Sequence, residues 1–115
     1  MKACIIQPSY SFDKKDLETR NLMLIDLLSE CDSSMDIIVL PEYSDALADV
    51  PGKEEFYSAC EKYGKSLLAA ASETAKRCSA YLFVNAGYKT CSSAIVLCSH
   101  NVIVLKVTNV GMSVL

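Results

Sequence analysis

The sequence has no apolar run close to the roughly 20 residues that a membrane-spanning helix needs. Its first segment, Met1 to Pro8, is too short for the apolar core of a signal peptide. Basic residues are not in excess: 11 Lys and Arg stand against 14 Asp and Glu, and they form no basic stripe that could bind a phosphate backbone. We therefore expect a cytoplasmic protein that binds neither a membrane nor a nucleic acid.

Residues typical of metal and phosphate sites are also scarce. His100 is the only histidine, and no Cys-x-x-Cys pair occurs, so we expect no metal site. The segment from Gln7 to Ser11 offers hydroxyl groups but no glycine, which argues against a phosphate-binding loop after the first apolar run. These absences predict a protein without a bound cofactor.

Six cysteines are present, and most of them lie within apolar patterns, where a free thiol serves as a small hydrophobic side chain. This placement indicates reduced thiols rather than a disulfide framework. Cys91, two residues after Lys89 in a predicted turn, is the only cysteine whose setting would lower a thiol pKa. A reactive role for Cys91 stays open beside the simpler interpretation of an ordinary loop cysteine.

The composition, 51% hydrophobic and 22% charged, is that of one globular domain spanning residues 1–115. The segment Asp36 to Tyr43 is its most informative part. Four apolar residues run from Ile37 to Leu40 without alternation, which predicts a strand buried on both faces. Glu42 follows where the strand stops, so we expect it beside an apolar cleft, with a raised pKa that suits a general base. The alternative is a solvated loop residue or a helix N-cap partner.

Apolar periodicity places the other elements along the chain. We predict an α/β fold of order β-α-β-α-β-β-β, parallel in its first part and antiparallel at its end. The first helix follows an N-cap at Asp13, and a loop of residues 43–52 precedes the second helix. The expected strands are Ala3 to Gln7, Asp36 to Leu40, Ala80 to Ala86, Ala94 to Leu97 and Val102 to Val107, and the second helix runs from about Phe56 to Cys78.

Three short motifs in this order resemble the opening of the carbon–nitrogen hydrolase (nitrilase) superfamily: Gln7-Pro8, Leu40-Pro41-Glu42 and Val84-Asn85-Ala86. The resemblance implies an αββα sandwich, of which this chain would form one half. It also implies hydrolysis of small-molecule amides, carbamoyl groups or nitriles by a Glu-Lys-Cys triad. The chain ends in apolar residues, so we expect an amino-terminal piece of a larger hydrolase or a relative that has lost the reaction.

Only Glu42 carries over from that triad, as the base that takes the proton from a thiol. Tyr43 is a candidate to line the substrate pocket, although a packing role fits it equally well. Asn109 stands where the resemblance expects the lysine, and Lys106 would face the opposite side of its strand. None of the six cysteines has the sequence context of the nucleophile.

The sequence also permits two hypotheses in which the protein is not an enzyme. One is a binding module of the flavodoxin-like α/β type. The other is an assembly role, because half of a sandwich leaves one sheet face uncovered and such a face favours a homo-oligomer.

Overall fold

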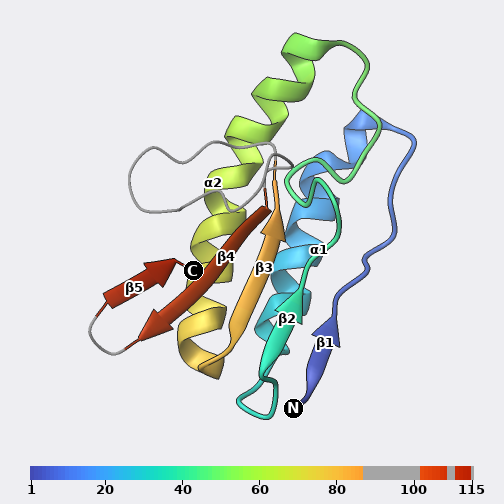
Figure 1. The fold of residues 1–115 in the computed structure, drawn as a ribbon. Coiled ribbons are helices and arrows are strands. Elements are labelled where there is room, and N and C mark those ends of the chain that lie inside the picture. The colour runs from blue at the N-terminus through green and yellow to red at the C-terminus, as the bar shows by residue number, and fades with distance from the viewer. Residues whose placement is uncertain (87–101, 109–110, 115) are drawn as a thin grey trace.

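The structure, a computed structural model, describes residues 1–86, 102–108 and 111–114, with side chains described for residues 1–86. These residues form one five-stranded sheet in the order β1-β2-β3-β4-β5, with two helices (Figure 1). The strands are β1 (Ala3–Ile5), β2 (Ile37–Val39), β3 (Tyr81–Asn85), β4 (Val102–Thr108) and β5 (Gly111–Val114). The first three strands pair in parallel, as the sequence predicted, and β4 and β5 are added antiparallel.

The first helix, α1 (Leu17–Ser29), follows a 3-10 turn, η1 (Lys14–Asp16). The predicted N-cap is confirmed: the Asp13 carboxylate accepts a 2.9 Å hydrogen bond from the Lys15 backbone N–H. At the other end, the Arg77 guanidinium donates hydrogen bonds to the backbone carbonyl oxygens of Leu28 and Cys31. A side chain of the second helix thus adds hydrogen bonds to two carbonyl groups at the end of α1, where a helix leaves carbonyl groups without helical partners.

The second helix, α2 (Lys53–Cys78), begins after Gly52, whose φ of +94° is a conformation that L side chains rarely adopt. It ends at Cys78 and is followed by Ser79, whose backbone lies in the left-handed region. Acidic residues lie in its first turn and basic residues in its last, which complements the helix dipole. The second helix that apolar periodicity predicted is thus confirmed, and Leu67 and Ala71 on its apolar face are fully buried. The buried residues of α2 are Ala59, Cys60, Gly64, Leu67, Leu68, Ala71, Thr74, Ala75 and Cys78.

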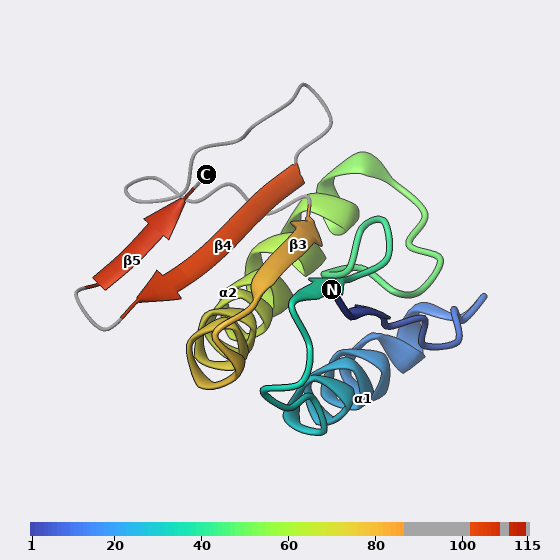
Figure 2. The same cartoon turned by 60° about the horizontal axis from the view of Figure 1, so that its bottom comes forward.

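Both helices lie on the same side of the sheet (Figure 2), and the core lies between them and the strands. Ile38 of β2 and Leu82 and Val84 of β3 point to this side and are fully buried. Their neighbours along the strands, such as Ile37 and Val39, are only half-buried. The prediction that β2 is buried on both faces was therefore wrong for the described side chains, because the helices cover one face and burial alternates with the period of two of a strand.

The end of the chain differs in part from the prediction. The strand expected at Val102 to Val107 is confirmed as β4, whereas β5 was not expected. The strand expected at residues 94–97 lies outside the described residues, as do Lys89, Cys91 and His100. Within the described part, neither helix combines the length and the apolar character that a membrane crossing requires. The chain is thus a small mixed α/β domain whose parallel part contains three strands.

Candidate functional site

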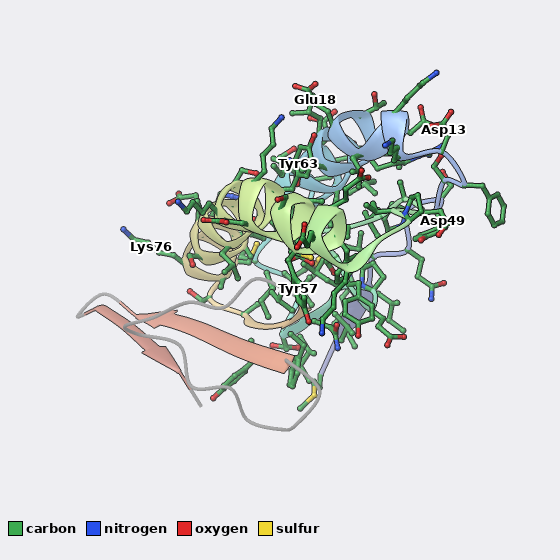
Figure 3. All side chains as sticks on the ribbon, turned by 90° about the horizontal axis from the view of Figure 1, so that it is seen from above. Asp13, Glu18, Asp49, Tyr57, Tyr63 and Lys76 are labelled. Atoms are coloured by element: carbon green, nitrogen blue, oxygen red, sulfur yellow. The ribbon has the colours of Figure 1, made fainter. Side chains whose placement is uncertain are left out.

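The candidate site lies at the edge of the sheet where the parallel strands end. Figure 3 looks down on this edge. Strand β2 ends at Val39, and the chain continues through Leu40 and Pro41 into a turn of residues 42–45. The neighbouring strand β3 ends at Asn85, beside this turn. In open α/β sheets the ligand crevice lies at this carboxyl edge, which is where the sequence placed Glu42.

Hydrogen bonds fix the turn to the end of β3. The Tyr43 backbone N–H donates to the Asn85 side-chain carbonyl oxygen at 2.9 Å, and the Ser44 N–H donates to the Asn85 backbone oxygen at 2.8 Å. The Ser44 hydroxyl also donates to the Pro41 carbonyl oxygen, which closes the turn on itself. Tyr43 has a φ of +48°, uncommon for a residue with a Cβ, and these bonds hold it there. The turn that carries Glu42 is therefore a defined structure.

Within this turn, Glu42 and Tyr43 are exposed, whereas Ser44 and Asp45 are 1% and 2% exposed. The expectation that Glu42 is buried was therefore wrong, and the alternative of a solvated loop residue is confirmed. The physical reason is the direction of the turn, which directs its second half into the protein and leaves its first half in water. As an exposed carboxylate, Glu42 can still accept a proton from a group brought to it.

Asp45 is the feature of this turn that the sequence did not reveal. A carboxyl group is seldom so deeply buried, and burial of one requires partners for its oxygens. In the sequence, Asp45 stands in a polar loop between Ser44 and Ala46, where an aspartate is normally solvated. Its burial follows from the tertiary structure, because the turn is attached to β3.

Tyr43, the candidate pocket residue, packs against α2. Its ring meets the Phe56 ring edge to face, with centroids 5.5 Å apart, and Phe56 in turn contacts Tyr57 at 5.9 Å. The packing role that the sequence left open is thus present. Because 42% of Tyr43 stays exposed, part of its surface is also available to a ligand.

An open cavity of about 370 Å³ lies next to the Glu42 turn. Its wall is almost entirely apolar, and the polar residue in its lining is Asn85, which bonds the turn. A volume of this size suits a small molecule. The lining residues are Ile37, Val39, Leu40, Phe83, Val84 and Asn85. Asn85 thus links the cavity to the turn that carries the carboxylate, and its place in the Val84-Asn85-Ala86 motif was the only signal for it in the sequence.

The cysteines near the helix ends do not lie at this edge, so they do not supply the nucleophile of the expected triad. Cys31 lies between α1 and the start of β2, and Cys78 lies at the end of α2, shortly before the start of β3. Both cysteines are therefore at the edge where the strands begin, opposite the edge that carries Glu42. The position expected for the lysine, Asn109, lies outside the described residues, and the side chain of Lys106 in β4 is not described. Among the described side chains, no group of three potential ligands is placed to hold a metal ion.

Comparisons with family models, with curated proteins and with solved structures found no significant match to this chain.

Proposed function

We propose that this chain is part of a carbon–nitrogen hydrolase that acts on small amides or nitriles, with Glu42 as its general base. One observation carries the proposal. The turn that bears Glu42 is hydrogen-bonded to Asn85, at the end of the adjacent parallel strand, and Asn85 also lines the apolar cavity. A carboxylate on a turn that is bonded to the wall of a small-molecule cavity supports a role as general base.

In this proposal, the Glu42 carboxylate takes the proton from a cysteine thiol, and the thiolate attacks the carbonyl or nitrile carbon of the substrate. The apolar wall of the cavity holds the substrate's carbon skeleton. A cation stabilises the negative charge that forms on the substrate's oxygen or nitrogen. The thiol and the cation come from outside residues 1–86. The other half of the sandwich covers the site, which gives the αββα arrangement that the sequence resemblance implies.

The test measures ammonia release from a panel of small amides, carbamoyl compounds and nitriles by the product of the complete reading frame. We expect release, and we expect Glu42→Gln to reduce it by a factor of about 10² or more, because a general base typically contributes that much. Glu61→Gln, which changes an exposed carboxylate on α2, is the matched control and should leave the rate unchanged. Residues 1–115 alone should show no turnover.

No release by the complete product from any compound of the panel would contradict the proposal. Release that is equal in Glu42→Gln and in the unchanged protein would also contradict it, because the hydrolysis would then use another base.

The uncovered sheet face favours a second candidate function, assembly through this face into a homo-oligomer. Ile5 is 69% exposed, and Ile37, Val39 and Phe83 of the same face are only half-buried. Burying such a surface against a second copy would remove apolar area from water. We expect light scattering at micromolar concentration to detect a dimer or larger species, which Ile5→Glu weakens.

The matched control for the assembly test is Leu22→Glu, because Leu22 is 58% exposed on α1, away from the sheet. It should leave the association unchanged. A monomer with a sharp cooperative melting transition would exclude this second function, without bearing on hydrolysis.

A further inference from the structure

Three cysteines from separate elements come together at the edge of the sheet opposite Glu42. Cys4 lies on β1, Cys31 follows α1, and Cys78 is the last residue of α2. Cys4 points to the helix side of the sheet, since its neighbours Ala3 and Ile5 are the exposed residues of the strand. Cys31 and Cys78 belong to the buried core that Cys4 packs against.

The surroundings of the Cys31 thiol include both Cys4 and Cys78. The pKa of Cys31 is raised to about 11, and burial is the largest cause. The charges of Cys4 and Cys78 and a hydrogen bond with Cys4 also raise it, whereas the charge of Arg77 lowers it. The Cys31 thiol also lies 3.8 Å from the Leu27 carbonyl oxygen, to which it donates. Of these two neighbouring cysteines, only Cys4 shares the wall of an open cavity with Cys31.

The same two thiols line an open cavity of about 330 Å³. Cys4 is half-buried, so its sulfur is the more accessible of the two, and Cys31 is 3% exposed. Gln7 and Glu30 add polar groups to a wall that is otherwise apolar. A small polar oxidant can therefore reach Cys4 from this cavity.

We propose that Cys4 and Cys31 are a redox-active pair, in which a hydroperoxide oxidises Cys4 and Cys31 then closes a disulfide between β1 and the end of α1. None of the described cysteines forms a disulfide in this structure. The pair is separate from the Glu42 site, and its oxidation does not depend on the proposed hydrolysis.

The chemistry balances with hydrogen peroxide as the oxidant. The Cys4 sulfur attacks one peroxide oxygen, the O–O bond breaks, and the leaving hydroxide takes the thiol proton as water. The Cys31 sulfur then attacks the Cys4 sulfur, the S–O bond breaks, and the second hydroxide leaves as water with the Cys31 proton. Two thiols lose two electrons in total, and one peroxide becomes two waters.

The roles of the two cysteines follow from their surroundings. Only a small fraction of Cys31 is thiolate at neutral pH, because burial raises its pKa, so Cys31 is a poor first nucleophile toward peroxide. Once Cys4 is a sulfenic acid, the reaction with Cys31 is intramolecular, and proximity offsets the low thiolate fraction. The rate of disulfide closure should therefore rise with pH from about pH 7 to about pH 9.

The test treats the folded chain with about one equivalent of hydrogen peroxide and maps the non-reduced peptides by mass spectrometry. We expect a linked pair of peptides that contain Cys4 and Cys31, lighter by two hydrogens and separated again by dithiothreitol. In Cys31→Ser, dimedone should label Cys4 as the trapped sulfenic acid. Cys78→Ser is the matched control and should keep the Cys4–Cys31 link.

Peptide mapping of the unchanged protein needs no variant, so the result does not depend on how a variant folds. Free Cys4 and Cys31 after treatment, or a link from either of them to another cysteine as the main product, would overturn the proposal. If the same link forms equally fast in denaturant, the folded arrangement does not direct it, and the proposal fails as well.

Discussion

The Tyr43 backbone N–H donates a 2.9 Å hydrogen bond to the side-chain carbonyl oxygen of Asn85. The two residues are far apart in the sequence, and their contact joins the turn after β2 to the end of β3. The position of Glu42, the residue before Tyr43, therefore depends on an amide from another strand.

Asn85→Ala removes this acceptor and should loosen the turn. We expect the free energy of unfolding to fall by about 1 kcal/mol, the usual contribution of one hydrogen bond. Hydrogen exchange should show reduced protection of the Tyr43 amide. Gln7→Ala is the matched control, because Gln7 is an exposed amide that follows β1 by two residues. Equal protection in both variants would mean that Asn85 does not hold the turn.

Gly52→Ala tests the backbone at the start of α2. Gly52 has a φ of +94°, and a Cβ built there meets no atom within 4 Å. The cost of the substitution is therefore backbone strain and not a clash, and we expect the free energy of unfolding to fall by about 1–3 kcal/mol. Chemical denaturation measures it. Ser58→Ala, at an exposed position of α2, should be nearly neutral, and an equal loss there would point to another cause.

Arg77→Met removes the guanidinium that bonds the Leu28 and Cys31 carbonyl oxygens at the end of α1. We expect a loss of about 1 kcal/mol from the free energy of unfolding, because the two carbonyl groups lose a charged donor. Lys76→Met, at the neighbouring exposed position, is the control. A loss in Lys76→Met as large as in Arg77→Met would attribute the effect to net charge.

Stability should fall as the pH rises from about 9 to about 11. Burial raises the pKa of Cys31 from 9.0 to about 11, and burial also raises that of Cys78. In this window the unfolded chain loses the thiol protons while the folded chain keeps them, so ionisation favours unfolding. Below pH 9 this contribution to stability is fully present.

Denaturant titrations across this pH range measure the effect, with the variant carrying both Cys31→Ala and Cys78→Ala as the comparison. The variant should be less stable at neutral pH, because it leaves a cavity, but its stability should depend less on pH. The same pH dependence with and without the two thiols would assign the loss to tyrosine and lysine side chains.

The sequence was sufficient for the elements that depend on local periodicity. The repeat through Cys60, Leu67, Ala71 and Cys78 predicted α2, and the N-cap at Asp13 predicted the start of the first helical segment. These features follow from the spacing of side chains along one segment, so a single sequence contains them.

Features that depend on which segments meet were not predictable. The apolar run from Ile37 to Leu40 has the same composition whether helices cover one face of the sheet or both. Only the structure therefore shows that one face of this strand is half-exposed. Asp45 is buried because its turn is bonded to β3, a contact between distant parts of the chain. The β5 segment contains Gly111 and Ser113 and has a low strand propensity of its own, and it forms a strand by pairing with β4.

The parallel pairing of the first three strands also sets the course of folding. Ala3 pairs with Ile37, and Ile37 pairs with Tyr81, so each pairing closes a long loop that contains a helix. Closing long loops costs entropy before the contacts repay it, and chains rich in such distant contacts fold slowly. During synthesis, the β2 edge that receives β3 stays open until Tyr81–Asn85 has left the ribosome. The helices can form early, but the core around Ile38 and Leu82 is completed only when that strand arrives.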